Sequence, residues 1–377
     1  MRSSMFGLGC FGLSLASAVL WACGGSNTSG FTNPDGGGSS GSGSSGSGSS
    51  SGSGSGSSSS GSGSSSGLGG NVNDAGSSGT TTTSTTIYAH TDTILYQLDP
   101  KSQAVTQIGT FTGLGGATGD DSITDLAVNA AGNLYVNSET VVYTAALPSG
   151  GTGNVALTKV ASISNAKSQY FYALGFTTKD ALGAGTGEVL IGGDGNGELW
   201  AIDTSTGATK DLGSFGADPG NSSNVLALSG DVVFYTGTSG PLGLATIRSC
   251  STSNGKNTCD GASDFLAGID MAAMATAYSS GTPAATLNAG IYGSPSPSAT
   301  GPGIGYKDVF GLGAWNGTVY GFTRSVTGVP ASLVSINTST GAGTLIPESV
   351  SITSGWSGAG VTTTVTVSIP NPPAPPK

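Results

Sequence analysis

A short pattern recurs along most of this sequence: a large residue, then Ala or Gly, then a mostly apolar residue. Its six copies follow one another at spacings of about 40 to 50 residues, at 126–128, 174–176, 226–228, 274–276, 312–314 and 359–361. A repeat of this length is typical of the four-stranded blades of a β-propeller. The small middle residue suits an innermost strand, because neighbouring backbones crowd around one axis there. We therefore expect an all-β fold with six blades.

A second repeat indicates how each blade turns. Alternating apolar segments that begin at Leu95, Leu199 and Leu333 each reach an Asp or Asn four residues later. A short polar side chain at that position can accept hydrogen bonds from the backbone and so start a turn between two strands.

The segment 125–136 reads Asp-Leu-Ala-Val-Asn-Ala-Ala-Gly-Asn-Leu-Tyr-Val. It resembles the inner-strand pattern of NHL-like and related six-bladed propellers, which implies a closed ring of blades. The last copy of the repeat follows the final outer strands, whereas the strands from Ile87 onward have no inner strand of their own. We expect the C-terminal strand to complete the first blade, leaving no open edge there. A pair of β-sandwiches or an open solenoid is the alternative. The segment 279–305, rich in Gly, Pro and Ser, is expected to form a degenerate fifth blade.

The N-terminus predicts export. Arg2 precedes a run of apolar and small residues that ends near Leu20, which is typical of a signal peptide and too short to cross a bilayer. The segment 20–24, Leu-Trp-Ala-Cys-Gly, resembles the lipobox of bacterial lipoproteins. This resemblance implies cleavage before Cys23 and attachment of a diacylglyceryl group to its thiol. An ordinary signal peptide with an incidental cysteine is the alternative.

Composition divides the rest of the chain. Between residues 36 and 70 every residue except Leu68 is Gly or Ser, which predicts a flexible linker. We therefore expect a signal peptide at 1–22, a lipid-anchored disordered Gly/Ser/Thr-rich tether at 23–86, the propeller at 87–370 and a Pro-rich tail at 371–377. The expected location is the cell envelope, at the outer membrane or cell surface, with the membrane as a partner through the lipid.

Charge limits the expected partners of the chain, and cysteine content indicates its compartment. The net charge is −10, so a polyanion gains little from this surface and nucleic acid is not an expected partner. Cys250 and Cys259 lie in a polar segment with no histidine nearby, so we expect a local disulfide formed in an oxidising compartment.

Candidate catalytic or metal-binding residues are few. His90 is the single histidine, and we expect it at the surface or at a strand end. Asp194, Asn196 and Glu198 place oxygen atoms at alternate positions, as calcium loops do. The same spacing is typical of a hairpin turn, which we favour. Calcium is the one cofactor that these residues suggest.

Two functions remain open. We favour a non-catalytic binding or scaffolding module for a protein, peptide or glycan. We therefore do not expect the chain to be an enzyme, although this alternative stays open. The alternative is a propeller hydrolase or lyase with a metal-assisted site on an acidic loop face. In a ring of up-and-down blades, one face is expected to carry Asp92, Asp120, Asp121, Glu139, Asp194, Glu198, Asp218, Asp270, Asp308 and Glu348. Of these, Asp120, Asp121, Asp218, Asp270 and Asp308 are the main candidates for contact with a cation or a basic ligand. Acidic residues that simply gather in loops would give the same pattern.

Overall fold

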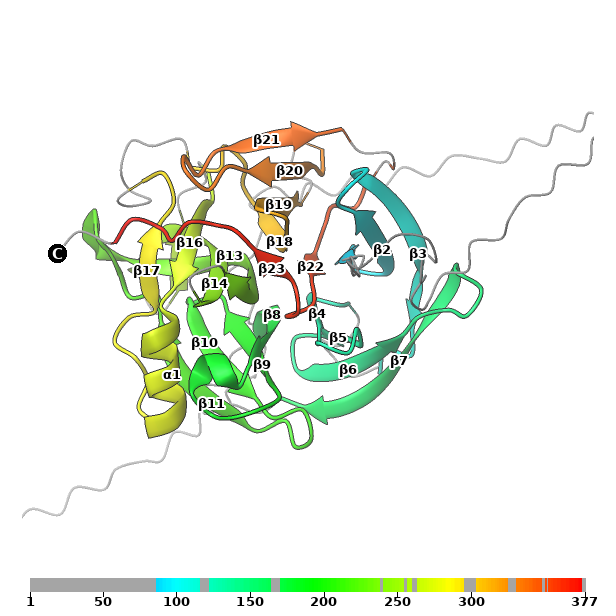
Figure 1. The fold of residues 1–377 in the computed structure, drawn as a ribbon, viewed down its shortest axis with the longest axis horizontal. Coiled ribbons are helices and arrows are strands. Elements are labelled where there is room, and N and C mark those ends of the chain that lie inside the picture. Colours follow the sequence, from blue (N-terminus) through cyan, green and yellow to red (C-terminus); the bar gives the residue numbers. More distant parts are fainter. Residues whose placement is uncertain are drawn as a thin grey trace, which may run out of the picture.

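The computed structural model describes residues 86–115, 122–163, 170–237, 240–253, 256–259, 263–294, 303–324, 330–347, 350 and 352–374. The fold of these residues is β-propeller-like: antiparallel sheets are arranged around a common centre (Figure 1). Their strands form five four-stranded groups, which we call blades 1 to 5.

Blade 1 joins the two ends of the folded region. From the centre outward it contains β22 (Gly358–Gly360), β1 (Ile87–His90), β2 (Ile94–Asp99) and β3 (Ala104–Thr112). In β22 and β1, Ala359 lies opposite Ala89 in an antiparallel pair.

Blade 2 contains β4 (Asp125–Val128), β5 (Leu134–Asn137), β6 (Val141–Ala146) and β7 (Gly153–Ser162). The outer strands β3 and β7 pair in parallel, with Gly109 opposite Gly153, so the first two blades form one eight-stranded sheet.

The remaining blades follow in chain order. Blade 3 contains β8 (Phe171–Thr178), β9 (Glu188–Asp194), β10 (Glu198–Ile202) and β11 (Thr209–Ser214), with the short helix η1 (Asp180–Leu182) between β8 and β9. Blade 4 contains β13 (Asn221–Gly237), β14 (Gly240–Ser253), β16 (Phe265–Ile269) and β17 (Asn288–Ile291). The strands β12 (Ala217–Asp218), β15 (Lys256–Cys259) and β23 (Thr366–Val367) pair with this blade. Blade 5 contains β18 (Val309–Trp315), β19 (Thr318–Thr323), β20 (Leu333–Ile336) and β21 (Gly343–Ile346).

The five inner strands, β22, β4, β8, β13 and β18, crowd together around the centre. A β-carbon on Gly360 of β22 would lie 2.8 Å from the carbonyl oxygen of Leu126 in β4, and one on Gly175 of β8 would lie 2.9 Å from that of Val232 in β13. Both glycines are the middle residue of the repeated pattern. The physical reason for a small residue at that position is therefore confirmed.

The second repeat also folds as expected. Asp99, Asp203 and Asn337 each accept a hydrogen bond from the backbone amide two residues later, at 2.8–2.9 Å. These turns connect the third and fourth strands of blades 1, 3 and 5.

The expected number of blades needs correction, because one predicted inner strand is a helix. Residues 274–276 lie within α1 (Met271–Ser280), which begins at the N-cap Asp270 and ends at Gly281 in the left-handed conformation. The segment is rich in alanine, which favours a helix over a strand. The described strands therefore form five blades rather than six. Within residues 279–305, the described β17 supplies the outer strand of blade 4.

A second correction concerns β13. The predicted triplet 226–228 does lie in this strand, but the pairing with β14 shifts between Leu228 and Val232. The stretch that reaches the centre is 232–234, because Val232 and Phe234 face Gly175 of β8. Asp231 stands immediately before that stretch.

After β22 the chain crosses the end of the ring where the inner strands finish; we call residues 361–374 the C-terminal strap (Figure 1). Thr362 donates to the carbonyl oxygen of Asn129 after β4, and Thr366 pairs with Thr236 of β13. A β-carbon on Gly268 of β16 would lie 2.5 Å from Cγ of Pro372. The described part of the predicted Pro-rich tail is thus packed against blade 4.

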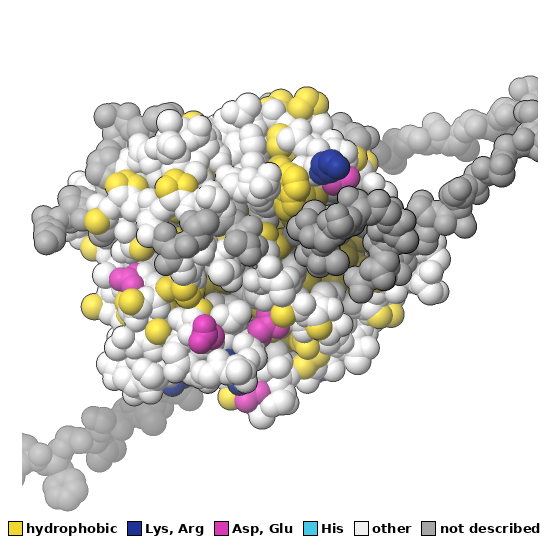
Figure 2. Space-filling model, in the orientation of Figure 1, with side chains coloured by type: hydrophobic (Ala, Val, Ile, Leu, Met, Phe, Trp, Pro, Cys, Tyr) yellow, Lys and Arg dark blue, Asp and Glu magenta, His cyan; other side chains and the backbone are white. Residues whose placement is uncertain are grey.

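The core lies within and between the blades. Trp356, which precedes β22, is fully buried, and its ring contacts those of Tyr96 in blade 1 and Phe322 in blade 5 edge-on, with centroids 5.2 and 5.3 Å apart. The face that carries the strap shows few and scattered charges (Figure 2). In the described part of the chain, no helix has the length and hydropathy needed to span a bilayer.

Candidate functional site

Charged side chains gather at the end of the ring opposite the strap, which we call the entry face. The inner strands begin there, and the turns between second and third strands emerge there. The described charged residues there include Asp92, Asp125, Glu139, Asp194, Glu198, Asp231, Arg248, Asp264, Lys307, Asp308 and Arg324. Several of them are buried and bonded across blade boundaries.

Two buried carboxyl groups lie at the centre of this face and are hydrogen-bonded to each other; we call Asp125 and Asp231 the axial pair. Both residues are fully buried. A hydrogen bond between two carboxyl groups requires a proton on one of them. Burial raises the pKa of both groups well above the usual value, and the negative charge of Asp231 raises that of Asp125 further.

The axial pair also binds the backbone of the neighbouring inner strands. Asp125 accepts from its own strand at Leu126 N (2.8 Å) and from β8 at Leu174 N (2.6 Å). Asp231 accepts from β18 at Leu312 N (2.6 Å) and from the amide of Ala359 in β22. One hydrogen-bonded pair therefore connects all five inner strands.

His90 lies beside this pair and is fully buried, so of the two expected positions, the surface or a strand end, it takes the strand end. Its Nδ1 lies 2.8 Å from the carbonyl oxygen of Thr91, so Nδ1 carries the proton in the neutral ring. Nε2 has no hydrogen-bond partner among the described residues. Burial lowers the pKa of His90 to about 4, so the ring is neutral at pH 7. The strand-end position was predicted correctly, because His90 is the last residue of β1.

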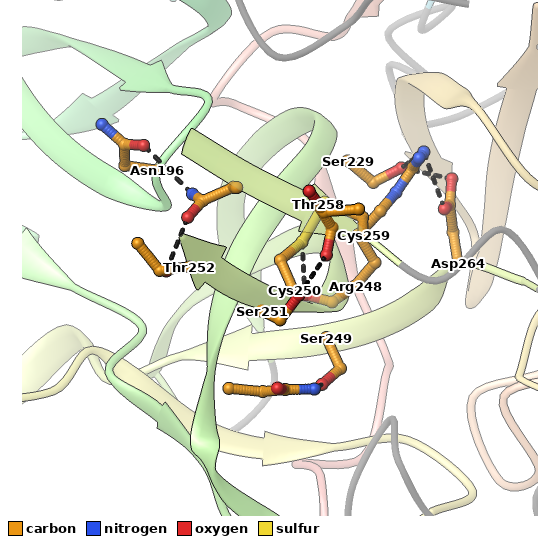
Figure 3. Close-up of a disulfide and its surroundings, with 12 residues drawn as sticks. Asn196, Ser229, Arg248, Ser249, Cys250, Ser251, Thr252, Thr258, Cys259 and Asp264 are labelled. Carbon is orange, nitrogen blue, oxygen red and sulfur yellow. Dashed lines mark hydrogen bonds and ion pairs between the residues drawn. A yellow bond between two sulfur atoms is a disulfide. The ribbon is translucent and has the colours of Figure 1, made fainter. Parts of the chain in front are cut away.

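A charged cluster joins blades 4 and 5. Nη2 of Arg248 lies 3.0 Å from Asp264 and 2.9 Å from Asp308, and it donates to the hydroxyl of Ser229 at 2.8 Å. Figure 3 shows Arg248 reaching toward Ser229 and Asp264. Burial raises the pKa of Asp264, although the adjacent Arg248 charge opposes this effect. The guanidinium group thus compensates for the burial of a carboxylate between blades.

A more exposed cluster joins blades 5 and 1. Arg324 lies 3.5 Å from Asp92, and the side chains of both are 40% exposed. Asp92 also accepts from the hydroxyl of Ser357, just before β22. The backbone amide of Arg324 donates to the carbonyl oxygen of Asp308, so this cluster continues the one around Arg248. Acidic and basic groups therefore alternate along the entry face from blade 4 to blade 1.

The calcium candidates form a hairpin turn between β9 and β10. One carboxylate oxygen of Asp194 accepts from the amides of Asn196 (2.9 Å) and Glu198 (3.1 Å). Burial raises the pKa of Asp194 to about 7, and the nearby Glu198 adds to this effect. The side-chain oxygen of Asn196 accepts from Asn257 at 3.0 Å. No group of three His, Cys, Asp or Glu side chains within the described ranges is arranged to hold a metal ion.

Three of the five main ligand-face candidates lie within the described residues. Asp308 lies on the entry face, and Asp218 is a buried turn residue that accepts from Gly220 N before β13. Asp270 is a correction: it stands at the opposite end of β16 from Asp264, roughly 20 Å away at ~3.3 Å per residue. There it caps α1, since its carboxylate accepts from Ala273 N. Asp120, Asp121 and Glu348 lie outside the described residues.

The predicted disulfide is present. Cys250 of β14 and Cys259 of β15 are directly opposite each other and are joined by a disulfide bond (Figure 3). The hairpin that they close contacts the β9–β10 turn through Asn257 and Asn196. Cys23, the predicted lipid attachment site, lies outside the described residues.

The centre of the ring is almost filled below the axial pair. A cavity of about 10 Å³ is lined by small and apolar residues of β4, β8, β13 and the end of β22. A space of this size holds one water at most.

No protein-family model matches this chain, and no curated protein matches its sequence. Solved structures resemble it only distantly. A protein of unknown function from Bacteroides thetaiotaomicron shares 12% identity over 72% of this chain and 57% of its own, with a TM-score of 0.38. Another from Bacteroides caccae shares 8% identity over 74% of this chain and 99% of its own, with a TM-score of 0.36. The Dos1 propeller shares 13% identity over 73% of this chain and 69% of its own, with a TM-score of 0.29. The blades are therefore assigned from the strand pairing alone, and the fold defines a β-propeller-like protein.

Sequence reasoning missed the axial pair and Arg248. One signal was available for the pair: Asp125 and Asp231 each stand directly before the stretch of an inner strand that reaches the centre. No comparable signal marks Arg248, because its partners Asp264 and Asp308 come from separate segments of the chain.

Proposed function

We propose that this chain is a lipid-anchored envelope protein whose five-bladed propeller, closed by β22, is a binding module that contacts its partner through the entry face. The observation that carries the proposal is the alternating row of charges from Asp264 to Asp92. Its buried members position the turns, while Asp92 and Arg324 expose 40% of their side chains. A rigid scaffold that presents charges of both signs supports recognition of a polar partner.

The partner class that fits is a protein, peptide or glycan. Asp92 offers an acceptor for basic or hydroxyl groups, and Arg324 offers planar donors for carboxylates or carbonyl groups. Phe310 supports the guanidinium group, which lies 5.8 Å from the ring centroid. The acidic net charge of the chain makes nucleic acid an unfavourable partner.

The alternative, a hydrolase or lyase, has the axial pair and His90 in its favour, because strongly shifted pKa values are typical of catalytic groups. The same carboxyl groups are fully buried and accept backbone amides from several strands. We infer from these bonds that the two carboxyl groups hold the blades together. We therefore favour binding over catalysis.

Export and anchoring rest on two observations. The Cys250–Cys259 disulfide is typical of proteins that fold in an oxidising compartment. The segment ending at Cys23 resembles a lipobox, and the Gly/Ser segment that follows would hold the propeller roughly 30–35 Å from the membrane.

The binding proposal is tested on peptide and glycan arrays with the purified Cys23→Ala protein. The ligands it captures are then assayed with a variant combining Asp92→Ala and Arg324→Ala, and with Asp203→Ala as a control on the strap side. We expect the double variant to lose at least tenfold in affinity and the control to bind normally. Equal binding by all three proteins would show that another surface is used.

A further inference from the structure

The axial pair points to a regulatory property that goes beyond binding at the entry face. We propose that the pair is a proton-dependent lock: with one shared proton it holds the inner strands together, and without that proton it releases β22. The released segment would be β22 together with the start of the strap.

The axial pair connects the inner strands in two sets. Asp125 links β4 to β8, and Asp231 links β13 to β18 and β22. The hydrogen bond between the two carboxyl groups joins these two sets of strands. If the proton leaves, that bond is lost and two negative charges face each other in a dry environment, where their repulsion is strong.

Charged groups of both signs lie on the elements around the axial pair. They are His90 and Asp92 from blade 1, and Arg248, Asp264, Lys307, Asp308 and Arg324 from blades 4 and 5; Lys307 is exposed and Arg324 is paired with Asp92. His90 is neutral, and Arg248 is already paired with Asp264 and Asp308. Lys and Arg are absent from the described inner strands, so no cation on these strands neutralises a second charge on the pair. This arrangement favours the singly protonated pair.

The inner strand held by the fewest hydrogen-bonded positions is β22. Of the five inner strands, β22 is the shortest, with three residues, and it pairs with β1 at only three positions. Its Ala359 amide bonds directly to Asp231. The other inner strands are continuous in sequence with the second strand of their own blade, whereas β22 is joined to β1 by hydrogen bonds alone. Weakening the axial pair is therefore expected to open the ring at β22.

The sign of the effect follows from linkage. Both carboxyl groups have a pKa above the unfolded value, so the folded ring binds more protons than the opened one. The closed form is then most favoured at acid pH and loses stability as pH rises through the folded pKa. One linked proton changes the opening equilibrium by up to about tenfold per pH unit.

The test is hydrogen exchange of the full chain, followed by mass spectrometry between pH 5 and 9 and corrected for intrinsic exchange rates. We expect the protection of residues 358–360 in the wild type to fall severalfold to about tenfold per pH unit in part of this range. In the double variant Asp125→Asn/Asp231→Asn, which has no carboxyl group left at this position, protection of the same residues should not depend on pH. Asp203→Asn, on an exposed turn, is the matched control and should follow the wild type.

A pH-independent wild type, or the same slope in the double variant, would overturn the proposal. If the double variant does not fold, infrared spectroscopy of the wild type at neutral pH provides the second measurement. We expect a carbonyl stretching band of a protonated carboxyl group in the wild type that is lost or shifted in Asp231→Asn. Its absence from the wild type would show that no proton is shared, and the lock would be rejected whether or not the entry face binds a partner.

Discussion

The α-carbon of Gly358 faces the side chain of Asp125 so closely that a β-carbon would overlap one carboxylate oxygen. The same β-carbon would lie 2.5 Å from Nε2 of His90. Two buried polar groups from different blades therefore leave no space for a side chain on β22. The glycine is required for this close approach and not for an unusual backbone angle, since its φ is not positive.

Gly358→Ala should therefore destabilise the domain by about 1–3 kcal/mol, the usual cost of forcing extra volume into a packed core. Urea denaturation measures the change. Gly150→Ala is the control, because a β-carbon there meets nothing within 4 Å and should leave stability almost unchanged. If both variants had the same stability, β22 would not be packed against the axial pair as described.

The disulfide should contribute measurably to stability. Replacing Cys250 and Cys259 by Ser removes the constraint on a loop of about ten residues, and the chain-entropy relation gives a loss of about 2.5–3 kcal/mol. Denaturant midpoints of the wild type and the double variant measure this loss. The wild type in reductant is the control and should approach the double variant; a double variant as stable as the oxidised protein would contradict the prediction.

Asp270 should stabilise α1 and not a ligand. Asp270→Ala removes the side-chain oxygen that accepts from Ala273 N at 2.9 Å, so we expect a loss of about 1 kcal/mol. Asp270→Asn should retain most of the stability, because Asn is also a good N-cap. Thermal unfolding of the three proteins provides the comparison. Equal destabilisation by Ala and Asn would indicate that the charge of Asp270 has another role.

His90 should make the domain less stable in acid. Its pKa is about 4 in the folded protein, whereas the usual value is 6.5, so below pH 6.5 the unfolded chain takes up a proton that the folded chain does not. Stability is therefore lost as pH falls from 6.5 toward 4, by up to about 1.4 kcal/mol per unit. Because buried carboxyl groups act in the opposite direction, the quantity to measure is the difference in unfolding free energy between wild type and His90→Gln. That difference should change with pH over this window and be constant above pH 7.5; a constant difference throughout would show that His90 is accessible to protons.

Cys23 should determine membrane attachment. Cys23→Ala is expected to move the protein from the membrane pellet to the soluble fraction, because the lipid is the proposed means of anchoring. Cys10→Ala, within the predicted signal peptide, is the control and should remain in the pellet. Retention of Cys23→Ala in salt-washed membranes would point to a different anchor.

Much of the ring follows from local sequence patterns. The triplets at 126–128, 174–176 and 312–314 are inner strands, because a small residue between larger ones marks a crowded strand. The copy at 274–276 satisfies the same pattern in a helix. In this segment the N-cap Asp270 and the C-cap Gly281 were the better signals, because they indicate a helix, which is what the segment forms. The error in blade number came from this one segment.

The candidate site could not be predicted in the same way. Asp125 and Asp231 look like ordinary strand-end aspartates until the ring brings them together. Their burial depends on amides supplied by β8, β18 and β22, far away in the sequence. Likewise, His90 is buried because β22 and Phe111 pack beside it, and the ring centroids of His90 and Phe111 are 5.9 Å apart. Such contacts are set by tertiary closure and leave no local pattern.

The bond between Ser357 and Asp92 has a consequence for how this protein is made. The two residues are 265 positions apart, so blade 1 has to wait for nearly the whole folded region to be synthesised. Contacts of such long range close slowly, because most of the loop entropy is lost before they form. Until then β1 exposes an unpaired edge that can join a strand of another chain. The period between the emergence of β1 and the arrival of β22 is therefore when this protein is most exposed to aggregation and to proteases, and when a chaperone would have most effect.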